Sequence, residues 1–139
     1  MSCFFDTNIL VYAVDARVPH KQRMALDLYA QALKAQTFVI STQVLIEFYN
    51  ATTKGQQPML KAHEAQMQLT ALARQYVVPT TAAMVVSASA LVERYRLQWW
   101  DALLLEAALS IGATTLYSED FQHGQRFGDL TVVNPFIAE

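Results

Sequence analysis

Short runs of apolar and β-branched residues alternate along the chain with longer stretches in which apolar positions recur at helical spacing. The short runs predict β-strands, and the longer stretches predict the helices between them. Strands that alternate with helices are typical of an α/β protein built on a parallel sheet. The predicted strands cover residues 3–6, 37–40, 76–78, 114–117 and 131–133.

The predicted helices have recognisable start and stop signals. Ser41 or Thr42 can cap a helix that runs to Lys54, since Ser and Thr side chains satisfy the free N–H groups of a first turn. Gly112 offers a left-handed C-cap to the last helix, directly before the fourth strand. The helices are expected over about residues 21–35, 41–54, 59–74, 80–96 and 99–111.

The bulk composition indicates one compact unit. A length of 139 residues with 53% hydrophobic content suits a single domain, expected over residues 1–139. No apolar run reaches the roughly 18 residues of a membrane span, and the first residues do not resemble a signal peptide. Cys3 is the only cysteine, which excludes an internal disulfide and a cysteine-based zinc site. We therefore expect a cytoplasmic protein with no membrane contact.

The net charge of −2 excludes the basic body of a protein that coats nucleic acid. Any polyanion must therefore be held locally. Most basic residues of the chain are interpreted as solvated surface charges. The candidates for substrate contacts are Arg17, Lys21, Lys54 and Arg126, the last of which is expected in a loop.

Four acids should meet at one edge of the predicted sheet. Asp6 ends the first strand, and Glu47 lies in the second turn of the helix that leaves the second strand. Asp101 opens the helix that descends into the fourth strand, and Asp120 follows that strand. A helix after a parallel strand begins at the carboxyl edge of the sheet, so all four acids belong to that edge. If the first strand is central and the fourth is its neighbour, Asp6 and Asp120 flank a crevice.

Four carboxylates in one crevice repel one another, and each close pair pushes one member towards protonation unless a cation is present. Oxygen ligands without His or Cys suit Mg²⁺ or Mn²⁺. Such an ion can generate a hydroxide nucleophile and stabilise the oxygens of an in-line displacement. The pattern therefore predicts hydrolysis of phosphodiester bonds without a Ser or Cys nucleophile.

Each acid alone also has a simpler explanation. Asp6 can be a helix cap, and Asp101 can be an acid favoured by a helix dipole. Glu47 shares a face with Gln43 and other polar residues, which usually means a solvated surface, and an acid in a loop is ordinary. Only the constellation indicates a site. We interpret the histidines, His20, His63 and His123, as surface residues. We interpret Trp99 and Trp100 as core or interface residues rather than residues that stack on bases.

The motifs around these acids resemble those of the PIN-domain nucleases, and within them the VapC-type toxins of bacterial toxin–antitoxin pairs. The resemblance rests on FFDTNIL at residues 4–10, STQVLIEF at 41–48, WDALL at 100–104 and YSEDF at 117–121. Each motif is weak alone, but four in this order are specific. They span essentially the whole chain.

The resemblance implies a PIN-like, three-layer α/β/α fold with a parallel sheet of four to five strands. It also implies Mg²⁺- or Mn²⁺-dependent endonucleolytic cleavage of RNA, a homodimer, and a small antitoxin partner that blocks the site. By position, the acids of the family match Asp6, Glu47, Asp101 and Asp120. The polar residues that would support the site are Thr7, Asn8 and Ser118. Glu119 is the fallback for the fourth acid.

Other classes fit less well. A receiver domain needs a phospho-accepting Asp after its third strand, where residues 77–80 read VVPT. A haloacid-dehalogenase-type phosphatase needs a second Asp at the position of Asn8. A PIN nuclease that processes RNA outside a toxin–antitoxin pair, and a binding module that has lost catalysis, stay open as alternatives.

Overall fold

The computed structural model describes residues 1–137, so residues 138 and 139 of the predicted domain lie outside the described part. Its strands are β1 (Cys3–Phe5), β2 (Phe38–Ser41), β3 (Tyr76–Val78), β4 (Thr115–Tyr117), β5 (Arg126–Phe127) and β6 (Leu130–Val133). Its helices are α1 (Thr7–Ala13), α2 (Pro19–Ala35), α3 (Thr42–Thr53), α4 (Ala62–Ala73), α5 (Ala82–Tyr95) and α6 (Trp99–Ser110).

Within the described residues the strands form one sheet in the order β3-β2-β1-β4-β6-β5. All neighbours are parallel except β5, which pairs antiparallel with β6. β1 is central and pairs with both β2 and β4, as a crevice between Asp6 and Asp120 requires. The predicted parallel sheet is therefore confirmed, with one short antiparallel strand added at its edge.

The added strand corrects one expectation. Arg126, expected in a loop, lies in β5 with its side chain exposed. β5 has only two residues, too few to show the alternation by which a strand is recognised in sequence. A two-residue turn joins it to β6, and Gly128 there adopts a φ of 62°, a conformation that glycine reaches without steric cost.

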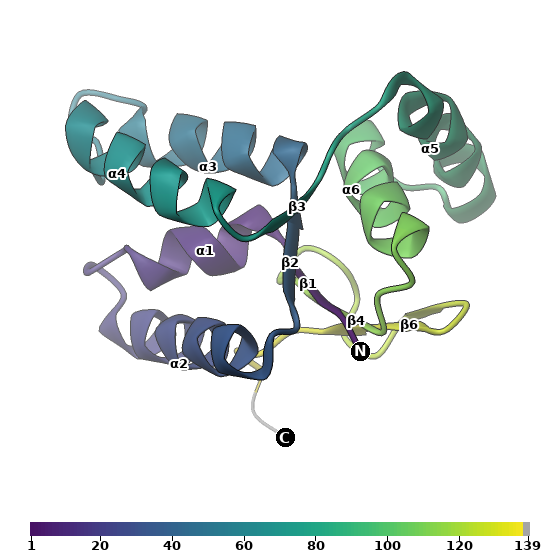
Figure 1. The fold of residues 1–139 in the computed structure, drawn as a ribbon, viewed down its shortest axis with the longest axis horizontal. Helices are drawn as coiled ribbons and strands as arrows, with labels where there is room; N and C mark the ends of the chain where they lie inside the picture. Colours follow the sequence, from purple (N-terminus) through teal and green to yellow (C-terminus); the bar gives the residue numbers. More distant parts are fainter. Residues whose placement is uncertain (138–139) are drawn as a thin grey trace.

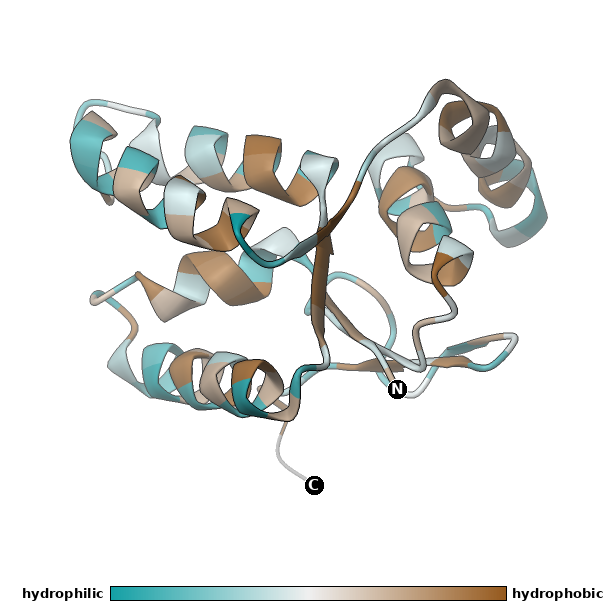
Figure 2. Cartoon of the chain, viewed as in Figure 1, coloured by the Kyte–Doolittle hydropathy of each residue, from teal (hydrophilic) through white to brown (hydrophobic). Residues whose placement is uncertain are grey.

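Helices cover both faces of the sheet (Figure 1). α1, α2, α3 and α4 lie on one side, and α5 and α6 lie on the other, which confirms the three-layer arrangement. Phe4 and Phe5, which point to opposite faces of β1, are both fully buried, as in parallel strands covered by helices on each side. Figure 2 shows the hydrophobic colour of the central strands, with hydrophilic residues on the outer surfaces of the helices.

Local signals explain most helix boundaries. Thr81 rather than Thr80 caps α5, because its side chain accepts a hydrogen bond from the N–H of Met84 at 3.2 Å. Gly112 follows α6 with a φ of 67°, as its C-cap position predicts. The short helix α1 is not among the predicted helices, although Asp6 caps it as the simpler explanation of that residue allowed. In the part of the chain that the structure describes, no helix is long and apolar enough to cross a membrane.

Candidate active site

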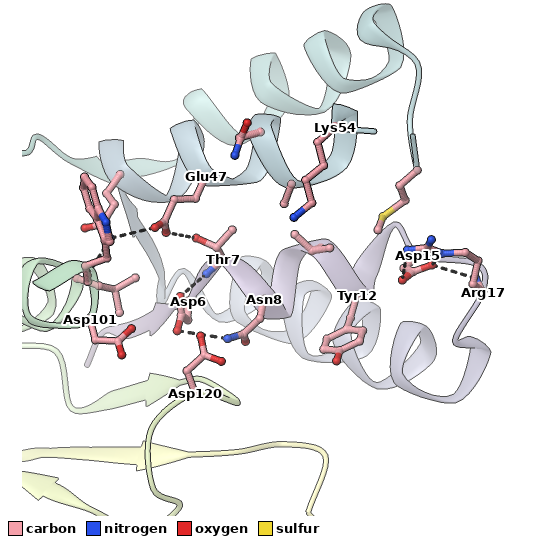
Figure 3. A pocket seen from close by; sticks show the side chains of 17 residues that line it. Asp6, Thr7, Asn8, Tyr12, Asp15, Arg17, Glu47, Lys54, Asp101 and Asp120 are labelled. Atoms are coloured by element: carbon pink, nitrogen blue, oxygen red, sulfur yellow. Dashed lines mark hydrogen bonds and ion pairs between the residues drawn. The ribbon is translucent and has the colours of Figure 1, made fainter. Parts of the chain in front are cut away.

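All four predicted acids line one pocket of about 570 Å³ at the carboxyl edge of the central strands. Figure 3 shows their side chains arriving from four different elements. Asp6 lies between β1 and α1, Glu47 is on α3, Asp101 is in the first turn of α6, and Asp120 follows β4. The parallel topology therefore brings together residues that are up to 114 positions apart in the numbering (120 − 6).

Asp6 is the most enclosed of the four acids. It is only 5% exposed and caps α1, where its Oδ1 accepts a hydrogen bond from the N–H of Thr7 at 2.7 Å. Its Oδ2 accepts from the hydroxyl of Ser118 at 2.6 Å and from the side-chain amide of Asn8 at 3.3 Å. The polar supports predicted for the site, Thr7, Asn8 and Ser118, therefore all contact this carboxyl group.

The pKa of Asp6 is raised from 3.8 to about 7, mainly by burial and also by the nearby charges of Asp120 and Glu47, whereas the hydrogen bonds from Ser118 and Thr7 oppose the rise. Asp101 is half-buried, and its pKa is also raised, first by burial and then by Asp120 and Glu47. Two of the four acids thus sense the charges of the other two. The pocket is an environment in which additional negative charge is unfavourable without a cation.

Glu47 is held in place by two donors. The Thr7 hydroxyl donates to its Oε1 at 2.8 Å, and the amide nitrogen of Gln43 lies 3.3 Å from its Oε2. Gln43 also donates to the backbone carbonyl of Trp100 at 2.9 Å, next to Asp101. Gln43 is buried, so the alternative interpretation of this face of α3 as a solvated surface does not hold at that position. The position of Gln43 one turn before Glu47 was the signal that could have revealed this support.

Glu119 and Asp120 have different surroundings. The carboxylate of Glu119 accepts a hydrogen bond from the Tyr12 hydroxyl at 2.8 Å and pairs with the Lys21 ammonium at 2.5 Å. Burial raises the pKa of Glu119, but Lys21 and Tyr12 outweigh that effect and lower it. Asp120 lines the pocket, whereas Glu119 does not, and the Asp120 N–H donates to the Ser118 hydroxyl at 3.1 Å. The geometry favours Asp120 as the fourth acid of the site.

The four candidate basic residues separate into two groups. Arg17 and Lys54 line the pocket. Lys21 is occupied by Glu119, and Arg126 is on the edge strand β5, and neither lines the pocket. The positions of Lys21 and Arg126 therefore do not support a direct substrate contact.

The histidines and tryptophans partly follow expectation. His20 and His63 are exposed, but His123 is only partly exposed, and its Nδ1 accepts a hydrogen bond from the N–H of Asn134 at 3.0 Å. His123 is therefore a partly exposed surface residue that also holds the backbone at Asn134. Trp99 packs against a small apolar cluster between α5 and α6, whereas Trp100 is 60% exposed.

The donor set suits a hard divalent cation, although no three acidic, His or Cys side chains of residues 1–137 already converge as a metal-binding group. Mg²⁺ usually keeps several water ligands and binds proteins through one or two carboxylates. Such a mode needs fewer converging side chains than a closed protein cage. A cation here would also relieve the repulsion that acts on Asp6 and Asp101.

The fold and the pocket together define a three-layer α/β protein with an acidic crevice at the carboxyl edge of its sheet. The sequence model of the PIN domain matches residues 3–126, and the chain therefore belongs to the PIN domain family. No curated protein sequence gives a significant match.

Solved structures with the same fold include toxin–antitoxin proteins. A toxin–antitoxin complex from Klebsiella pneumoniae aligns with a TM-score of 0.70 and 25% identity, over 97% of this chain and 98% of that chain. VapC20 from Mycobacterium tuberculosis, described as a toxin that cleaves the sarcin–ricin loop, gives 0.66 and 22% over 86% and 90%. VapBC2 from Rickettsia felis, bound to a promoter DNA fragment, gives 0.68 and 22% over 95% and 97%.

Proposed function

We propose that this protein is a metal-dependent endoribonuclease and the toxin of a type II toxin–antitoxin pair. The observation that carries the proposal is the buried Asp6 carboxyl, whose pKa is raised to about 7 in a pocket shared with Glu47, Asp101 and Asp120. Perturbed acids that converge in a cleft are typical of functional sites. Membership of the PIN domain family supports the assignment to nucleases.

In this proposal Asp6, Glu47, Asp101 and Asp120 hold Mg²⁺ or Mn²⁺. The bound ion supplies a water of lowered pKa and neutralises charge on the phosphate oxygens. The chain's own contribution is to orient the acids, since Ser118 and Asn8 hold Asp6 while Thr7 and Gln43 hold Glu47. Hydrogen-bond donors of this kind fix the orientation of the oxygens that bind a metal and increase metal affinity.

The partners follow from the solved relatives and from the surface. Two of the similar structures are described as a toxin–antitoxin complex and as VapBC2, which supports a small antitoxin protein as the partner of this chain. Ile46, Tyr49 and Trp100 are 66%, 40% and 60% exposed and line one mainly apolar pocket, and a contiguous exposed apolar surface is typical of a protein contact. A homodimer and an antitoxin complex are both part of the proposal.

The central test uses purified protein and a mixed RNA substrate. Cleavage should require Mg²⁺ or Mn²⁺ and should stop in excess chelator, because the proposed nucleophile is a water activated by the bound ion. Asp101→Asn should remove activity, whereas the matched control Asp129→Asn, an exposed acid in the turn between β5 and β6, should not. Cleavage that persists in excess chelator, or in the Asp101→Asn variant, would refute the proposal.

The toxin role needs a separate test. The product of a small neighbouring gene, if it is the antitoxin, should co-purify with this chain and suppress its cleavage of RNA. A chain that cleaves RNA but neither binds nor responds to such a product would be a PIN nuclease of another pathway.

A further inference from the structure

The pocket that holds the four acids has a second end with a different charge. Figure 3 shows Asp101 and Asp120 at one end, and Lys54 and the Asp15–Arg17 pair at the other. Lys54 extends from α3 towards α1, into the space between the two helices. We propose that Lys54 binds a backbone phosphate of the RNA strand about one to three nucleotides from the phosphate that is cleaved. This inference rests on the proposed function.

The spacing along α3 supports this position. Glu47, Asn50 and Lys54 all line the pocket, and their separations of three and four residues place them on one helical face. Seven residues from Glu47 to Lys54 correspond to a rise of about 10 Å along the helix axis. Phosphates of a stacked strand are about 3.4 Å apart along the axis, and those of an extended strand are further apart. A strand with one phosphate at the acids therefore places another of its phosphates near Lys54.

Two basic residues line the pocket, and of these Lys54 is the one available to bind a phosphate. Arg17 donates from its Nε to Asp15 at 2.8 Å and from its Nη2 to the other oxygen of Asp15 at 3.2 Å, so its charge is largely compensated. The side chain of Lys54 is exposed and forms no hydrogen bond or ion pair with any of the residues 1–137. Because the protein carries a net charge of −2, attraction of a polyanion depends on such local cations.

The surface between the two ends suits a nucleic-acid strand. Val11 and Tyr12 on α1 face this space, with Asn50 and Ala51 on α3, and none of them carries a charge near neutral pH. A sugar and a base can therefore lie between the acids and Lys54 without meeting a further carboxylate. Single-stranded RNA is the substrate form that this arrangement favours, because its backbone can extend along the pocket from the acids to Lys54.

Binding is measured by fluorescence anisotropy with an oligoribonucleotide that the wild-type chain cleaves. The Asp101→Asn background with Mg²⁺ present prevents cleavage during the measurement. Lys54→Met should raise the Kd roughly two- to tenfold, the range of one partly screened ion pair, and should reduce the salt dependence by about 0.7 in log Kd per log salt. Lys54→Arg should retain most of the affinity. The control Lys34→Met removes the same charge from the exposed last turn of α2 and should change neither quantity.

A second measurement locates the contact. A set of oligonucleotides carries one neutral methylphosphonate each, at one of the three positions on either side of the cleavage site. The Kd of each is measured for the Asp101→Asn protein with and without Lys54→Met. One of these methylphosphonates should weaken binding to the protein that has Lys54 but not to the Lys54→Met variant, because that variant already lacks the contact. In cleavage assays Lys54→Met should raise KM and leave kcat nearly unchanged, as expected for a contact present before and during reaction.

The possible failures are distinguishable. If the wild-type chain cleaves RNA but Lys54→Met behaves like Lys34→Met in Kd and salt dependence, the inference is wrong and the proposed function stands. The same conclusion follows if every methylphosphonate affects both proteins equally. If the wild-type chain neither binds nor cleaves RNA with Mg²⁺ or Mn²⁺, the proposed function and the inference fail together.

Discussion

Replacement of Asp6 by Asn should stabilise the metal-free protein at pH 8 but not at pH 4. Asp6 is 5% exposed, and its pKa is raised from 3.8 to about 7, mainly by burial. The folded state therefore holds the proton on this group more tightly than the unfolded state. As pH rises from about 4 to about 7, the unfolded state loses the proton first, so the free energy of unfolding decreases.

The size of this effect follows from the pKa difference. A pKa difference of about three units, at roughly 1.4 kcal/mol each, corresponds to about 4 kcal/mol. Asn carries no charge and avoids this loss, but its NH₂ group replaces the Oδ2 atom that accepts from Ser118 at 2.6 Å. A rearranged hydrogen bond costs about 1 kcal/mol. Asp6→Asn should therefore gain roughly 1–3 kcal/mol over wild type at pH 8.

The assay is urea unfolding in excess chelator, followed by tryptophan fluorescence at pH 4, 6 and 8. The matched control is Asp27→Asn, which changes an exposed acid on α2 and should show no such trend. Metal should cancel most or all of this gain at pH 8, because a ligand at about 100 times its Kd adds about 2.7 kcal/mol to wild type only. A difference between Asp6→Asn and wild type that stays constant from pH 4 to pH 8 would refute this reasoning.

Three further predictions concern single side chains. Thr7→Val removes the donor that holds Glu47 at 2.8 Å and should lower metal affinity or cleavage about ten- to a hundredfold, measured by Mn²⁺ titration; an unchanged affinity would contradict it. Alanine at Asp120 should abolish cleavage while alanine at Glu119 only weakens it, since Glu119 is held by Lys21 and Tyr12; a greater loss at Glu119 would reverse the assignment. Gly112→Ala should lower stability by about 1 kcal/mol in thermal unfolding, because its φ is 67°; an unchanged melting temperature would count against this cause.

The elements of the sheet could be predicted because their signals are local. β1, β2, β3, β4 and β6 appear as short apolar runs, and each lies within a residue or two of its predicted range. Two elements were not predicted as such. β5 has two residues and α1 has seven, so neither repeats its hydrophobic period often enough to be recognised. β5 is stabilised by pairing with β6, and α1 by packing on α2 and α3.

The grouping of the acids was also predictable, because it depends only on strand direction. A parallel sheet puts the ends of its strands and the starts of the following helices at one edge, whatever the details of packing. Asp6, Glu47, Asp101 and Asp120 meet in the pocket for this reason. Their roles as metal ligands stay a proposal that the experiments above test.

The sequence by itself determined the sheet, its parallel direction and the edge where the acids gather, since hydrophobic period and chain order dictate these features. Only the tertiary structure showed that Asp120 and Lys54 line the pocket whereas Glu119 and Lys21 do not. Glu119 is bound by Tyr12 and Lys21, which lie 107 and 98 residues away along the chain. Contacts at such separations depend on how helices pack on the sheet. No local pattern records that packing, because it is set by the combined fit of many side chains.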